Sequence, residues 1–229
     1  MPVHDQLLGS TQPVLSISLE PGERVIAETG EFAWMTDSIR MTPGAAHLSD
    51  YTATNQQGTV AFTARLPGSI VPVEITPGRE YFVHRAGFLA GTPGIEVATG
   101  FSQVLGSSAD AATSEFILRR ISGHGRAWVQ LCGDVVSRDV AAGTSLRTHP
   151  WNIGMAEGSV AVQLAEVALP AGSHPGSCAH YFALLSGPGT VWLQSTPLQA
   201  APHRRLGAGS APAREFPAAA GAAGFAAPR

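Results

Sequence analysis

The sequence predicts an all-β protein, a compact double-stranded β-helix or β-sandwich built from three pseudo-repeats. First, 26 Gly and 17 Pro in 229 residues separate short segments that are rich in Val, Ile, Leu, Phe and Thr, which is typical of short strands joined by turns. Second, helical periodicity is nearly absent: residues 43–58 and 106–116 are predicted to be loops or at most one or two helical turns. Third, similar phrases recur at a regular spacing.

The chain is predicted to hold one domain with an extension at each end. A hydrophobic content of 44% is enough for a sizeable core. We expect an N-terminal extension over 1–12 and the all-β domain over 13–196. Residues 197–229 are rich in Ala, Pro, Gly and Arg, and their prolines interrupt any helix, so this tail is predicted to be disordered.

The first recurring phrase is a glycine turn followed by an apolar strand. Its three copies are LEPGERVIAETGEFAWM (19–35), ITPGREYFVHRAGFLAG (75–91) and the weaker VAAGTSLRTHPWNIGM (140–155). The matched positions are Gly22, Gly78 and Gly143 in the turn, and Phe32, Phe88 and Ile153 in the strand. Pro followed by Gly is the type II turn pattern, because Gly accepts a positive φ without a clash.

The second recurring phrase closes each unit. SGHGRAWVQL (122–131) matches SGPGTVWLQS (186–195), and RLPGSIVPVEI (65–75) is a weaker third copy. The glycines that match are Gly68, Gly125 and Gly189. They follow the first-phrase glycines by 46, 47 and 46 residues. This regular spacing predicts three units of one plan.

Two tryptophans in the second phrase are the candidate interface or ligand residues. After Gly125, residues 127, 129 and 131 are apolar and alternate with polar neighbours of Trp128, and Trp192 has the corresponding place in the later copy. Alternation therefore puts both indoles on the face opposite the core. Three alternatives stay open: the same chain covers them, a neighbouring subunit covers them, or they bind a small molecule or base.

Motifs for catalysis, cofactors or metals are missing from the sequence. The Gly-x-Gly of the second phrase precedes a strand and not the helix that a dinucleotide site needs. His174 and His180 lie six apart in a loop-like stretch, and His84 and His149 occupy matching repeat positions that suggest a structural role. The carboxylate pairs are most simply solvated charges; they are Asp134 with Asp139, and Glu28 with Glu31. We therefore predict no enzyme, no cofactor and no metal.

Charge and cysteine content predict the location and the kind of partner. The net charge is −3, with +3 after Thr196 and −6 before it, which disfavours nucleic acid. Charged residues make up 14% against about 25% on average, a hint that another subunit covers part of the surface. The start lacks a signal peptide and no long apolar run is present, so we expect a cytoplasmic protein with reduced Cys132 and Cys178. Peripheral membrane association stays open.

The phrases together resemble a known family. SLEPGERVIAETGEFAWM, LPGSIVPVEI, FLAGTPGIEV, LRRISGHGRAWVQLCGDV and SGPGTVWLQS occur in this order and are similar to the altered inheritance of mitochondria twenty-four family over 13–196. The resemblance implies a double-stranded β-helix related in shape to the tryptophan RNA-binding attenuator protein, and homo-oligomers, with trimers favoured. The mitochondrial relatives are associated with inner-membrane organisation. The insertions after the first and second units are shorter here than in the family.

These observations predict a non-enzymatic homo-oligomeric scaffold or interaction module with an unknown protein partner. A module that binds RNA or a small ligand, by analogy with the attenuator protein, is the first alternative, and it depends on fold analogy alone. A cupin-like metalloenzyme is the second alternative, although the sequence has no His-x-His pair.

Overall fold

The computed structural model describes residues 4–65, 67–105, 114–167 and 181–197. These residues form nineteen strands and two short 3-10 helices, η1 (Thr29–Glu31) and η2 (Pro150–Asn152). The predicted all-β fold is confirmed. Within the described ranges, the search for a helix with the length and hydropathy of a membrane span found none.

The strands form four antiparallel sheets, numbered here from the N-terminal end. In hydrogen-bonded order, sheet 1 holds β1 (His4–Leu8), β2 (Val14–Leu19), β7 (Gly58–Thr63) and β4 (Phe32–Met35). Sheet 2 holds β5 (Ile39–Pro43), β6 (Leu48–Ala53), β3 (Arg24–Glu28), β10 (Phe88–Gly91), β13 (Gly125–Cys132) and β8 (Gly68–Ile75). Sheet 3 holds β11 (Ile95–Leu105), β12 (Ser114–Gly123), β9 (Tyr81–His84), β16 (Ile153–Glu157), β19 (Gly189–Gln194) and β14 (Val135–Val140). Sheet 4 holds β15 (Ser145–Thr148), β18 (Tyr181–Ser186) and β17 (Ala161–Glu166).

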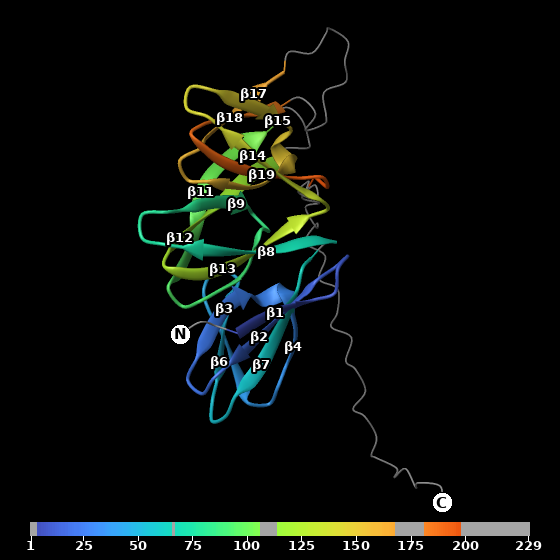
Figure 1. Ribbon diagram of the computed structural model, residues 1–229, viewed down its shortest axis with the longest axis vertical. Helices are drawn as coiled ribbons and strands as arrows, with labels where there is room; N and C mark the ends of the chain where they lie inside the picture. The colour runs from blue at the N-terminus through green and yellow to red at the C-terminus, as the bar shows by residue number, and fades with distance from the viewer. Residues whose placement is uncertain (1–3, 66, 106–113, 168–180, 198–229) are drawn as a thin grey trace, which may run out of the picture.

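The four sheets stack along the long axis of the molecule, with sheet 1 at one end and sheet 4 at the other (Figure 1). Three hydrophobic cores lie between them. The first, around Phe62 and Trp128, joins sheets 1 and 2. The second, around Phe88 and Val129, joins sheets 2 and 3, and the third, around Phe116 and Trp151, joins sheets 3 and 4. Sheets 2 and 3 therefore each contribute to a core on both faces.

One order of strand pairing occurs three times along the chain. The strands β2–β7, β8–β13 and β14–β19 will be called units 1, 2 and 3. Within each unit the first strand pairs with the sixth and the sixth with the third, while the fourth pairs with the fifth and the fifth with the second. A bulge lies in the third strand of every unit, between Phe32 and Trp34, Phe88 and Ala90, and Ile153 and Met155.

The turn glycines that the sequence indicates all have a positive φ, but Gly68 differs in position from the predicted alignment. Gly125 and Gly189 open the sixth strands of units 2 and 3, and Gly58 opens that of unit 1. Gly68 instead opens β8, the first strand of unit 2. The matching of Gly68 is thus wrong in strand position, because short Gly-containing turns precede both kinds of strand.

Two further segments differ from expectation. The predicted loop over 43–58 contains β6, in which Ser49, Tyr51 and Ala53 are buried. The alternation of polar and apolar residues is not visible in this sequence, because the polar Ser49 is buried together with Tyr51 and Ala53. The expected extension over 1–12 contains β1, which pairs with β2 along its whole length. From residue 198 on, the predicted tail lies outside the described residues.

Candidate functional site

Trp128 lies in the first core and has no exposed surface. Its Nε1 donates a hydrogen bond to Asp5 Oδ2 at 3.0 Å, so the N-terminal strand β1 covers the indole. Of the alternatives left open, cover by the same chain is correct for this residue. Trp128 is therefore not an interface or ligand candidate, which corrects the expectation from strand alternation.

Asp5 also forms an ion pair with Arg126. Its Oδ1 lies 2.7 Å from Arg126 Nη1, and Arg126 Nε lies 2.5 Å from Glu74 Oε1. The hydrogen bond to Glu74 is the largest cause that raises the pKa of Arg126, and Asp5 raises it further. These contacts join β1, β8 and β13, so they secure the first strand to the second sheet.

Trp192 has a different environment from Trp128 although both occupy the same place in their units. It is partly buried against the second core, and its ring centroid lies 6.1 Å from that of Tyr81. In the third strands across from the two indoles, Ala90 pairs with Trp128 and Met155 pairs with Trp192. Trp192 therefore stays a candidate with limited exposure.

The stacking of sheets explains why alternation misplaced Trp128. A strand with one polar face is expected only where that face meets water. Strand β13 belongs to sheet 2, and its two faces contribute to the first and second cores. Arg126 and Gln130 mimic a solvent face because they make specific hydrogen bonds: Gln130 Nε2 donates to the carbonyl oxygen of Ala86, and its Oε1 accepts from the N–H of Arg65.

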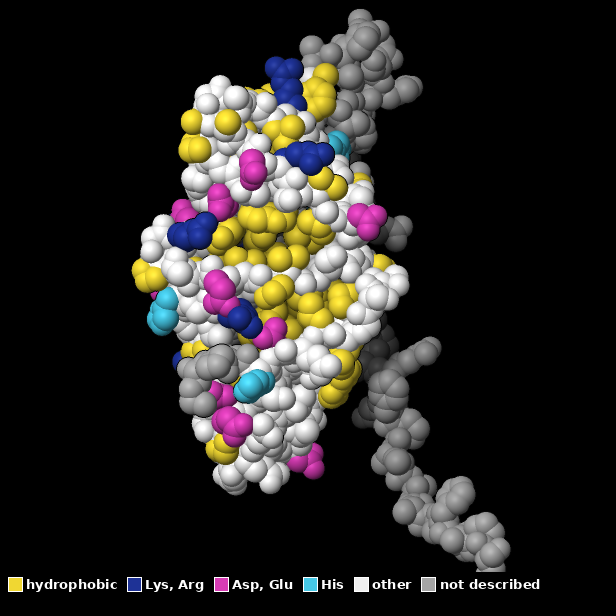
Figure 2. Space-filling model, viewed as in Figure 1, with side chains coloured by type: hydrophobic (Ala, Val, Ile, Leu, Met, Phe, Trp, Pro, Cys, Tyr) yellow, Lys and Arg dark blue, Asp and Glu magenta, His cyan; other side chains and the backbone are white. Residues whose placement is uncertain are grey.

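Two exposed aromatic residues and an exposed Met lie together on β4, an edge strand of sheet 1. Phe32, Trp34 and Met35 are 36%, 47% and 37% exposed. The sequence signal for this surface is the uninterrupted apolar run FAWM, which corresponds by strand position to FLAG in β10. Sequence reasoning missed it because an apolar run of this kind is also typical of a buried strand, and the matching FLAG strand is indeed wholly buried. In Figure 2, another group of hydrophobic side chains lies over the middle of the visible face, with a few charged side chains beside it.

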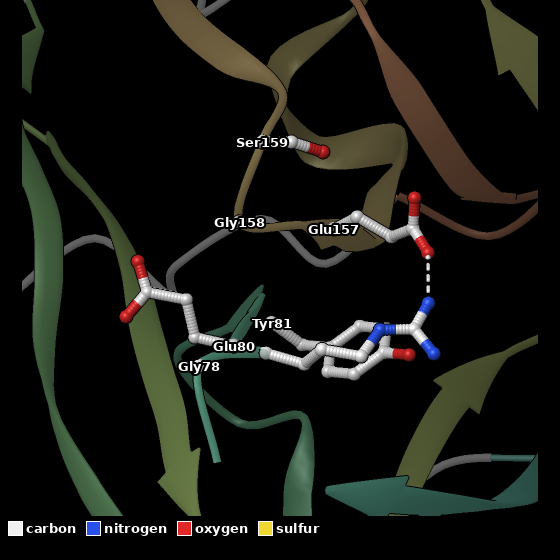
Figure 3. Close-up of a pocket in the computed structure, with 7 residues that line it drawn as sticks. Gly78, Glu80, Tyr81, Glu157, Gly158 and Ser159 are labelled. Carbon is white, nitrogen blue, oxygen red and sulfur yellow. Dashed lines mark hydrogen bonds and ion pairs between the residues drawn. The ribbon is translucent and has the colours of Figure 1, made fainter. Parts of the chain in front are cut away.

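A shallow pocket of about 440 Å³ lies where β9 meets β16 (Figure 3). Arg79 and Glu157 form an ion pair across it at 3.0 Å. The other oxygen of Glu157 accepts the N–H of Thr190 at 3.0 Å, and the N–H of Gly158 donates to the carbonyl oxygen of Glu80 at 2.7 Å. Because these polar groups bond to one another across the strand junction, they serve to hold units 2 and 3 together.

The remaining candidates for catalysis or metal binding contact different partners. Glu28 pairs with Arg119, and Glu31 pairs with Arg65, so these two carboxylates serve different ion pairs. His84 is buried with its ring 5.9 Å from that of Trp151. No cluster of three or more His, Cys, Asp or Glu with the spacing of a metal site occurs in the described part of the chain. His174, His180 and Cys178 lie outside that part.

Cys132 is buried in β13 at 4% exposure, and burial raises the pKa of its thiol. The thiol is therefore protonated and shielded at neutral pH, and both properties slow its reaction with disulfide reagents. In a Cys178→Ser variant, we expect the native protein to react with Ellman's reagent at least about tenfold more slowly than the urea-unfolded protein. Equal rates would contradict the burial of Cys132.

Comparisons with known proteins give one family and one fold. The family model described as mitochondrial biogenesis AIM24 matches residues 6–196. The crystal structure of protein SPYM3_0169 from Streptococcus pyogenes is similar with a TM-score of 0.66 and 14% identity, over 86% of this chain and 94% of that one. At this identity the likeness concerns the fold alone. No curated protein matches the chain. The implied likeness to the tryptophan RNA-binding attenuator protein stays a prediction.

Proposed function

Because this chain belongs to the mitochondrial biogenesis AIM24 family, we propose that it acts as a non-enzymatic homo-oligomeric scaffold or interaction module, with a trimer as the favoured assembly. The observation that carries this proposal is the apolar edge strand β4. Phe32, Trp34 and Met35 expose more than a third of their surface each. Aromatic residues and Met are enriched in the cores of protein interfaces.

Low charge supports the same conclusion. Only 14% of residues carry a charge, and a surface with few charges has little to oppose contact with another protein. An exposed strand edge adds unpaired backbone donors and acceptors to the apolar side chains, which makes it a template for pairing with another chain.

Light scattering coupled to size-exclusion chromatography tests the proposal. We expect the full-length protein at micromolar concentration to elute with a mass that is a multiple of the 23.7 kDa chain, and about three times this mass for the favoured trimer. Dilution should shift the mass downward by mass action. A monomer throughout the micromolar range would contradict the oligomeric function.

A further inference from the structure

Two internal junctions join the three units edge to edge. In sheet 2, β10 of unit 2 pairs with β3 of unit 1, with Ala90 opposite Ala27 and Gly91 opposite Ile26. In sheet 3, β16 of unit 3 pairs with β9 of unit 2, with Met155 opposite Val83 and Ala156 opposite Phe82. At both junctions, the third strand of one unit pairs antiparallel with the second strand of the unit before it.

The same two strand positions have free edges at the ends of the stack. The third strand of unit 1 is β4, which pairs only with β7 among the described strands. The second strand of unit 3 is β15, which pairs only with β18 among them. They lie at opposite ends of the molecule, so they cannot meet within one chain (Figure 1). Each end therefore carries one half of a junction that the chain forms twice internally.

Side chains of the third strands are buried in the two strands that form a junction and exposed in β4, which forms none. Trp34 is 47% exposed, whereas the residues at its position in the joined strands, Ala90 and Met155, are 0% and 1% exposed. Phe32 is 36% exposed, and Phe88 and Ile153 at its position have no exposed surface. These positions are thus covered wherever the junction is complete.

We propose that the free edge of β4 pairs antiparallel with the free edge of β15 in a second copy of this chain. Applying the internal register to these strands sets Met35 opposite Arg147 and Trp34 opposite Thr148. This inference rests on the proposed homo-oligomeric function and names the contact that builds it. The contact is heterologous, since it joins two different edges. Such contacts give a ring where the rotation between copies closes and an open filament where it does not. A ring of three copies is the form that the favoured trimer requires.

On both edges, the backbone N–H groups of the residues that would face each other point away from their own sheet. The N–H of Thr36 donates to the carbonyl oxygen of Thr59 in the sheet, so by alternation the N–H of Met35 points away from β7. The N–H of Gly187 donates to the carbonyl oxygen of Thr144, so the N–H of Arg147 points away from β18. Proline at position 35 or 147 removes an outward donor and leaves the intrachain ladder bonds in place.

Two matched proline variants of the full chain test the pairing. We expect Met35→Pro and Arg147→Pro each to raise the dissociation constant of self-assembly by at least about tenfold, because each lacks one edge. When the two are mixed, each supplies the edge that the other lost. The mixture should therefore form a one-to-one dimer of about twice 23.7 kDa by light scattering. Val136→Lys is the control, since Val136 is 45% exposed on β14, an edge of sheet 3; it should assemble like the wild type.

Circular dichroism and thermal melting establish that each variant is folded. Should a proline variant unfold, Trp34→Lys decides, because it keeps every backbone donor and places a charge in the contact; it should weaken assembly by at least about tenfold. Folded variants that keep the wild-type mass overturn this pairing and leave the oligomeric function intact. Self-assembly of Arg147→Pro with wild-type affinity alongside monomeric Met35→Pro also overturns it, since β4 would then pair with itself. A monomeric wild type contradicts both proposals.

Discussion

Trp128→Ala is expected to lower the free energy of unfolding by about 3–5 kcal/mol, the range for a large aromatic side chain removed from a core. The side chain has no exposed surface, and its truncation leaves a cavity between sheets 1 and 2. It also leaves Asp5 without the donor at 3.0 Å that holds strand β1. Urea unfolding followed by circular dichroism, at one protein concentration for all variants, measures the change.

Phe182→Ala is the matched control for this loss. Phe182 is also an aromatic residue on a strand, but it is 45% exposed on sheet 4. Its truncation should change the free energy of unfolding by no more than about 0.5 kcal/mol, as for most surface substitutions. If Trp128→Ala cost no more than Phe182→Ala, the burial of Trp128 by its own chain would be wrong.

Gly68→Ala is expected to cost about 3 kcal/mol or more, since overpacking costs about 1–3 kcal/mol and backbone strain adds about 1–3 kcal/mol. A Cβ at this position would lie 2.0 Å from the carbonyl oxygen of Leu131 and 2.8 Å from the amide nitrogen of Gly133. Both are backbone atoms of the neighbouring strand region and cannot rotate away. The φ of +158° is also one that side-chain-bearing residues rarely adopt.

Gly78→Ala separates the two contributions. Gly78 has a φ of +84°, but a Cβ there would meet nothing within 4 Å. Only the left-handed backbone opposes the methyl group, and the cost should be about 1–2 kcal/mol. Thermal melting of both variants tests the difference. Equal melting temperatures would show that close approach contributes nothing at Gly68.

Local sequence patterns predicted the parts of this protein that depend on local sterics. The Pro21-Gly22 and Pro77-Gly78 turns follow from the φ values that Pro and Gly prefer, and Gly22 and Gly78 have φ of 85° and 84°. The all-β class follows from short β-branched segments between such turns. Strand β6 escaped prediction because its buried positions hold the polar Ser49 as well as Tyr51 and Ala53, so polar and apolar residues do not alternate along it.

The candidate site could not be predicted in the same way. The sequence singled out Trp128 for its polar neighbours, but Arg126 bonds to strand β8, Gln130 bonds to the turn before β10, and the indole is buried. The apolar runs FAWM and FLAG are alike in sequence, yet β4 is an edge strand and β10 lies within a six-stranded sheet. Nothing in either run records which strand will lie beside it.

The amino-acid sequence therefore determined the fold class, the turn positions and the membership of a family, because turn sterics and short-range polarity act over a few residues. Tertiary structure alone decided which faces are covered. Stacking of four sheets gives β13 a core on each side, and the end of the stack leaves β4 with a free edge. Burial depends on the contacts between strands far apart in the chain, and those contacts separate the buried Trp128 from the exposed Trp34.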